Sequence, residues 1–177
     1  MRILITGVAA TGKSTIIKEL KERGLVAVDL HGTDLVFWQD RKTKKRVKYT
    51  PGRPREWFNT VDRLFDIDRL KEILQQHNDI VVAGTAGGNQ TECFSLFDKV
   101  ILLQCDSQTR IHRMKTRTNK SGFGKTKEEQ DEEIEWQKEF EPLILSHGAI
   151  PVNTEGDIGE VADKIMELSR PAHQQPQ

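Results

Sequence analysis

Short apolar runs alternate along the chain with longer segments of helical periodicity. Apolar runs at residues 2–6, 25–29, 79–83, 97–104 and 150–152 predict buried strands. Apolar residues at helical spacing predict helices over residues 13–22, 61–76, 107–117, 127–146 and 157–169. Because strands that alternate with helices form parallel sheets with right-handed crossovers, we expect an α/β fold with helices on both faces of one sheet.

One region, residues 34–59, departs from this alternation. Residues 37–40 and 46–49 alternate like strands around a polar turn at 42–45, which predicts a β-hairpin insertion after the second strand. Loops at the carboxyl ends of a parallel sheet surround the crevice where ligands bind. The insertion is therefore expected close to a substrate.

Length and charge limit the function classes. A chain of 177 residues predicts a single domain over residues 1–170, followed by a flexible tail at 171–177. Its 27 basic side chains balance 27 acidic ones, so no global charge recruits nucleic acid or a membrane. The N-terminal apolar run is too short for a signal peptide or a spanning helix, and we expect a cytoplasmic protein without a membrane partner.

Residues 7–14, Gly-Val-Ala-Ala-Thr-Gly-Lys-Ser, fit the phosphate-binding pattern G-x-x-x-x-G-K-[ST]. The motif lies between a predicted strand and a predicted helix, as phosphate-binding loops do. Its glycines let the backbone wrap a phosphate, and the helix dipole favours the anion. The predicted nucleotide-binding residues are Gly7, Ala9, Ala10, Thr11, Gly12, Lys13, Ser14 and Thr15.

The motif predicts ATP and Mg²⁺ as cofactors. Lys13 would reach the β and γ phosphates, the Ser14 hydroxyl would bind Mg²⁺, and Thr15 would bond the α phosphate. Asp29 ends the strand predicted beside the loop. We expect this carboxylate to hold a magnesium-bound water or to accept the proton of an acceptor hydroxyl.

Two other classes of phosphate-loop protein fit less well. Residues 29–32 spell the D-x-x-G motif of GTPases, but Asp29 follows Ser14 by only 15 residues and no guanine-binding N-K-x-D motif occurs. An AAA-type or transport ATPase would need a longer chain and an acid at the end of the third strand. That strand ends here in Gly84-Thr85, which argues against this class.

The chain resembles the adenylate kinase, shikimate kinase and gluconate kinase group through residues 1–170. The resemblance is carried by the phosphate loop, the acid at Asp29, the pair Arg113 and Arg117, and the glycine-containing segment 119–125. Residues 84–90, 97–98 and 117–119 look more closely like bacterial proteins described as predicted nucleotide kinases or ATPases. The resemblance implies a three-layer P-loop NTPase fold, a five-stranded parallel sheet ordered 2-3-1-4-5, and a lid over about residues 117–127.

Arg113 and Arg117 are four residues apart on a predicted helix and therefore face the same way. A lid that folds over the triphosphate would bring both guanidinium groups against the transferring phosphoryl group. We assign both a catalytic role beside Lys13 and Asp29. The alternative is a solvated basic stripe on a helix that also holds Arg110 and Lys115.

The acceptor side offers weaker candidates, Asp34, Arg69 and Asn89. Asp34 is a second candidate for the base, Arg69 alternatively forms a surface ion pair, and Asn89 alternatively caps the helix that follows it. Residues 41–55 hold eight cations and no acid. This basic segment would attract a phosphorylated or nucleic-acid acceptor, or it is only a solvated hairpin.

These features together predict an ATP-dependent phosphotransferase. It would move the γ-phosphate of Mg-ATP to a small hydroxyl- or phosphate-bearing acceptor, namely a nucleotide, nucleoside or metabolite. Its partners would be ATP and that acceptor, and we do not favour nucleic acid. A nucleotide-dependent regulatory ATPase and a polynucleotide end kinase remain alternatives, and no feature indicates an oligomeric state.

Overall fold

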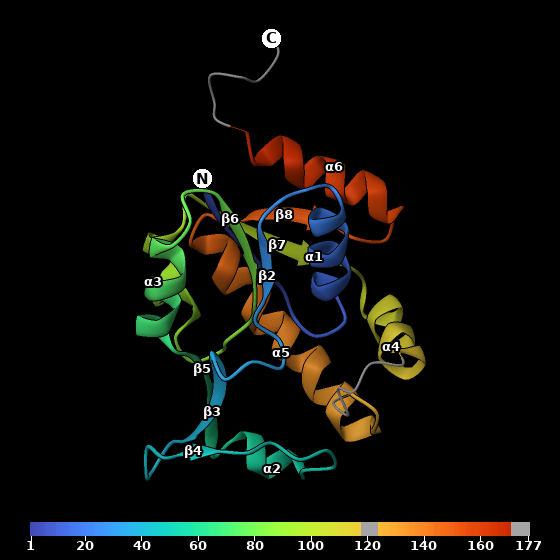
Figure 1. The fold of residues 1–177 in the computed structure, drawn as a ribbon. Helices are drawn as coiled ribbons and strands as arrows, with labels where there is room; N and C mark the ends of the chain where they lie inside the picture. The colour runs from blue at the N-terminus through green and yellow to red at the C-terminus, as the bar shows by residue number, and fades with distance from the viewer. Residues whose placement is uncertain (118–123, 171–177) are drawn as a thin grey trace.

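The computed structural model describes residues 1–117 and 124–170 (Figure 1). Its main sheet has five parallel strands in the order β2-β6-β1-β7-β8. The strands are β1 (Arg2–Thr6), β2 (Ala27–Asp29), β6 (Ile80–Ala83), β7 (Lys99–Gln104) and β8 (Ile150–Asn153). They correspond in chain order to the predicted strands one to five, so the predicted order 2-3-1-4-5 is confirmed.

Helices cover both faces of this sheet, because nearly every residue of its central strands is buried and alternate side chains point to opposite faces. Helices α1 (Lys13–Glu22) and α6 (Ile158–Leu168) cover one face, where Ile3 and Ile5 pack with Ile16, Leu20 and Ile165. The result on this side is a continuous apolar layer that supports the start of α1.

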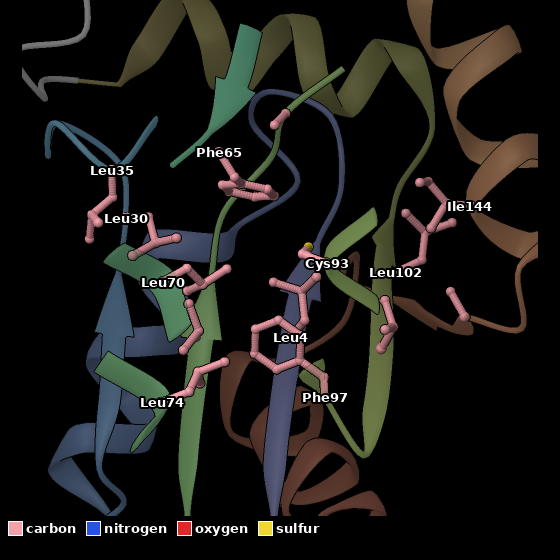
Figure 2. Packing of buried hydrophobic residues seen from close by; sticks show 14 of the residues in the cluster. Leu4, Leu30, Leu35, Phe65, Leu70, Leu74, Cys93, Phe97, Leu102 and Ile144 are labelled. Atoms are coloured by element: carbon pink, nitrogen blue, oxygen red, sulfur yellow. The ribbon is translucent and has the colours of Figure 1, made fainter. Parts of the chain in front are cut away.

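The opposite face is covered by α3 (Ile67–Gln75), α5 (Lys127–Ser146) and the 3₁₀ helix η1 (Gln90–Leu96). Figure 2 shows Leu4 and Leu102 of the sheet packed with Leu70, Leu74 and Ile144 of these helices. The predicted three-layer α/β/α architecture is therefore confirmed.

The insertion is larger than predicted. Strands β3 (Val36–Asp40) and β4 (Arg46–Val47) form the expected hairpin, but β5 (Val61–Phe65) joins them in an antiparallel sheet ordered β4-β3-β5. A short helix, α2 (Arg55–Phe58), precedes β5. The small sheet extends away from the main sheet below the carboxyl ends of β2 and β6 (Figure 1).

The prediction of one helix over residues 61–76 is wrong in its first third. Residues 61–65 alternate between faces and pair with β3, and α3 starts only at Ile67. Asp66 ends the strand and caps the helix, because its side chain accepts a hydrogen bond from the Arg69 N–H. The apolar residues of this segment suit both periods, and pairing with β3 decides between them.

Several polar contacts attach the insertion to the main domain, and two side chains of the main domain each make two of them. The Asn89 side chain accepts from the Phe65 N–H (2.8 Å) and donates to the Phe65 carbonyl oxygen (3.0 Å). The buried Glu129 carboxylate accepts from the Tyr49 hydroxyl (2.6 Å) and from the Gly52 N–H (3.1 Å). Polar contacts therefore hold the small sheet beside the end of β6 and the start of α5.

Helix α4 (Ser107–Thr116) ends one residue before the predicted limit, and α5 and α6 agree with their predicted positions within one residue. Most of the predicted lid, residues 118–123, and the predicted tail, residues 171–177, lie outside the described residues. In the described part of the chain, no helix is both long and apolar enough to cross a membrane.

Candidate active site

The phosphate-binding motif forms a loop between β1 and α1. Gly7, Ala10 and Gly12 have positive φ angles of 145°, 65° and 98°. A Cβ on Gly7 would lie 2.5 Å from the Leu103 carbonyl oxygen, so a larger residue would displace the loop from β7. Gly12 is the N-cap of α1 and has no side chain to bond the first amides of the helix. Those amides are therefore available to an anion.

The Lys13 side chain lies along this loop. Its Nζ donates to the carbonyl oxygens of Gly7 (2.5 Å) and Val8 (2.9 Å). Burial, together with the smaller effects of the Arg63 and Arg110 charges, lowers the pKa of Lys13 to about 7, while Glu133 and Asp29 oppose this shift. The lysine is thus held in place close to two carboxylates and two further cations.

Ser14, Thr15 and Asp29 line the same cavity as Lys13. Ser14 and Thr15 are exposed, and one Asp29 carboxylate oxygen accepts from the His31 N–H (2.8 Å). The other oxygen has no partner among the described residues that would keep it from a ligand. Mg²⁺ usually binds one or two protein oxygens, with water and phosphates as its remaining ligands. The Ser14 hydroxyl and the Asp29 carboxylate fit such a site.

Arg113 and Arg117 both line the cavity, as their spacing predicts. Arg113 donates to the Thr154 carbonyl oxygen (2.6 Å) and the Thr154 hydroxyl (3.2 Å), which fixes its guanidinium on the β8 side of the loop. Burial lowers the pKa of Arg117, and the charges of Glu133 and Glu129 oppose that shift. Neither residue belongs to a fully solvated stripe.

Arg110 and Glu133 support the phosphate loop, a role that the sequence reasoning missed. The Arg110 side chain is fully buried and donates to Glu133 (2.9 Å), to the Ala9 carbonyl oxygen (3.0 Å) and to Gln137. Glu133 also accepts from the Ala9 N–H (3.0 Å). Both groups of Ala9 are therefore bonded, and the phosphate loop is tied to α4 and α5. No periodicity in the acidic α5 sequence distinguishes Glu133 from its neighbours.

The three weaker candidates have different positions. Asp34 lines the cavity and forms an ion pair with Arg69 (2.6 Å), which lowers the pKa of the Asp34 carboxyl. Arg69 and Asn89 are not among the cavity-lining residues. Asn89 uses its amide oxygen and nitrogen to bond Phe65, so its observed contacts are structural.

The cavity measures about 1560 Å³ and extends from the phosphate loop to the insertion. Ligand pockets generally measure about 300–1,000 Å³, so this one has room for more than a single small ligand. Its walls come from both sheets and from α4 and α5. On the insertion side they include Trp38, Tyr49, Phe58 and Arg63.

Arg63 is a further cavity residue that the sequence reasoning missed. Its pKa is lowered by burial, and its charge acts on both Lys13 and His31. In the strand Val61–Phe65 the alternation puts Arg63 on the same face as the buried Val61 and Phe65. A charge at an inward position is the signal that would have identified it, had the strand been recognised.

Comparison with known proteins gives two kinds of match. A family model described as AAA domain matches residues 3–136. This match contradicts the expectation that a third strand ending in Gly84-Thr85 excludes an AAA-type protein. In place of the acid, the Thr85 hydroxyl donates to the Gly7 carbonyl oxygen (2.6 Å) and thereby supports the loop. No curated protein sequence matches the chain.

Solved structures share the fold at low sequence identity. A shikimate kinase from Acinetobacter baumannii in complex with shikimate is 19% identical with a TM-score of 0.60, covering 94% of this chain and 91% of that one. A shikimate kinase from Aquifex aeolicus is 17% identical with a TM-score of 0.56, covering 96% and 95%. A deoxyadenosine kinase from M. mycoides with bound dATP is 16% identical with a TM-score of 0.53, covering 94% and 97%. The chain therefore has the fold of P-loop small-molecule kinases.

Proposed function

The chain belongs to the AAA domain family, and because it also has the fold of P-loop small-molecule kinases, we propose that it is an ATP-dependent phosphotransferase. It transfers the γ-phosphoryl group of Mg-ATP to an oxygen of a small acceptor, releasing ADP and a proton. The acceptor is a nucleotide, a nucleoside or a metabolite.

The observation that carries this proposal is the extent of the cavity. A protein that only hydrolyses ATP needs room for one nucleotide and a water molecule. The cavity here continues past Lys13 and Asp29 to a second wall made by the insertion, with Trp38 and Arg63 on it. A second substrate would fit between that wall and the phosphate loop.

The proposed mechanism assigns tasks to four side chains, and Asp29 has two of them. Ser14 and Asp29 would hold Mg²⁺, which neutralises phosphate charge when it is bound. The loop amides and Lys13 hold the phosphates, and Asp29 accepts the proton that the acceptor hydroxyl loses. Arg117 stabilises the charge that spreads over the transferring group.

The test is transfer of labelled phosphate from ATP to panels of nucleosides, nucleotides, sugars and hydroxy acids. The parent protein should label at least one class of acceptor, and Lys13→Ala should abolish that labelling because the lysine neutralises the phosphates. Circular dichroism would show whether this variant keeps its fold. Absence of transfer to every class, with intact ATP binding, would refute the proposal.

The family assignment favours one second candidate, a nucleotide-dependent regulatory ATPase. In that case ATP turnover would produce inorganic phosphate, and no metabolite panel would divert the label. Measuring free phosphate and labelled acceptor in the same reactions separates the two functions.

A further inference from the structure

Arg63 is held in position by the pairing of two insertion strands. It lies directly opposite Trp38 in the β3–β5 register, and its guanidinium carbon lies 5.8 Å from the centre of the Trp38 ring. An aromatic face at this distance attracts a cation and limits its rotamers. The backbone of β5 is fixed as well, since the Arg63 carbonyl oxygen accepts from the Gly88 N–H (3.0 Å).

Arg63 differs in its partners from the other insertion arginines that line the cavity. Arg41 pairs with Asp62 at 2.9 Å, and Arg46 pairs with Asp66 at 2.6 Å. Within residues 1–117 and 124–170, no carboxylate lies within ion-pair distance of Arg63. The nearby Glu133 already accepts from Arg110 and Ala9.

This arrangement has an energetic consequence. A guanidinium that is partly withdrawn from water loses hydration, and the neighbouring Lys13 charge adds repulsion. Within the described residues, the Trp38 face and the charge of Glu133, which is itself bonded to Arg110 and Ala9, offset part of this cost. An anion in the cavity would offset both costs, so Arg63 has the properties of a ligand-binding residue.

The position of Arg63 indicates whether it would bind the nucleotide or the acceptor. Arg113 is bonded to Thr154, which follows β8, so this cation lies on the β7–β8 side of the phosphate loop. Arg63 is bonded to Gly88, which follows β6, so it lies on the β6–β2 side with the insertion. The two arginines therefore come from opposite sides of the phosphate loop, and the strand that carries Arg63 belongs to the insertion wall of the cavity.

We propose that the acceptor carries an anionic oxygen group, a carboxylate or a phosphate, which Arg63 binds with its paired N–H donors. This inference rests on the proposed function and narrows its substrate class. Neutral nucleosides and neutral sugars are thereby excluded as preferred acceptors. Arginine suits this task because its planar donors match both kinds of oxygen group.

The experiment compares acceptors that differ in one charged group. Transfer of labelled phosphate and quenching of tryptophan fluorescence are both measured with gluconate and glucose, dAMP and deoxyadenosine, and shikimate and its methyl ester. The proteins are the parent, Arg63→Gln, Arg63→Lys and Lys42→Gln. Lys42 is an exposed insertion residue outside the cavity, so its variant controls for the loss of one positive charge.

In the parent, the anionic member of at least one pair should exceed its neutral partner by about ten- to a hundredfold in kcat/KM, as a charge-assisted hydrogen bond allows. Arg63→Gln should remove that preference, Arg63→Lys should restore part of it, and Lys42→Gln should retain it. Affinity for Mg-ATP alone should change less than about threefold in Arg63→Gln, because the acceptor side is altered.

Three results would overturn the inference. These are equal use of neutral and anionic partners, a preference that survives Arg63→Gln, and a loss of Mg-ATP affinity as large as the loss of acceptor activity. A different result would refute the proposed function without refuting the anion subsite. If no acceptor is labelled but fluorescence still reports anion binding that depends on Arg63, the subsite stands and phosphoryl transfer does not.

Discussion

Glu133 should contribute to stability through its buried ion pair with Arg110. The Arg110 side chain is 0% exposed and that of Glu133 is 8% exposed, so water screens neither charge. Replacing Glu133 with glutamine keeps the shape of the side chain and one oxygen acceptor, but it leaves the Arg110 charge buried without a carboxylate. We therefore expect this conservative change to destabilise the fold.

The magnitude can be bounded from these contacts. Removing one partner of a buried ion pair usually costs about 3–5 kcal/mol. Glutamine can still accept one of the two hydrogen bonds that Glu133 receives from Arg110 and Ala9, which recovers about 1 kcal/mol. The expected loss in the free energy of unfolding for Glu133→Gln is thus about 2–4 kcal/mol.

Urea unfolding of a double-mutant cycle measures this pair. The cycle uses Glu133→Gln, Arg110→Met and the double variant, and the coupling energy should be about 2 kcal/mol. The matched control is the cycle of Lys127→Met and Asp131→Asn, another ion pair that involves α5. Its side chains are 82% and 52% exposed, so its coupling should stay below about 0.5 kcal/mol. Equal coupling in the two cycles would show that the burial argument is wrong.

Three further predictions concern the chemistry. Asp29→Asn should leave Mg-ATP affinity nearly intact, because the amide keeps one oxygen for Mg²⁺ or its water, and it should lower phosphoryl transfer by about a hundredfold in single-turnover assays, because the amide cannot accept the proton. Arg117→Ala should lower kcat by about a hundredfold with little change in KM for ATP, and a change confined to KM would assign it to ground-state binding. Since the pKa of Lys13 is lowered to about 7, its ammonium form is lost as pH rises through this value, and calorimetry should show Mg-ATP binding about fivefold weaker at pH 8 than at pH 7. Lys13→Arg stays protonated and should show no such dependence.

The main sheet was predictable because its strands are buried on both faces. Residues 3–5 and 100–103 are uninterrupted apolar runs at the centres of β1 and β7. The phosphate loop was predictable for a local reason: Gly7 and Gly12 adopt backbone angles that the motif requires wherever it occurs. The predicted residues Lys13, Ser14 and Asp29 consequently line one cavity.

The acceptor side was less predictable because nonlocal pairing decides its structure. Val61, Leu64 and Phe65 fit a helical stripe as well as a strand, and only the contact with β3 selects the strand. That error hid Arg63, because a charged residue between the apolar positions of an amphipathic helix is expected on its solvated face. Glu133 and Arg110 were hidden for a similar reason: their burial depends on where α4 and α5 meet the phosphate loop.

Helix α5 links the two halves of the candidate site. Glu129 and Glu133 are one turn apart on this helix and therefore project from the same side of it. Glu133 bonds the phosphate loop at Ala9, and Glu129 bonds the insertion at Tyr49 and Gly52. The spacing between the loop and the insertion is thus set by one helical turn. Phosphoryl transfer depends on holding two substrates at a fixed separation, and a common rigid support for both binding surfaces provides that condition.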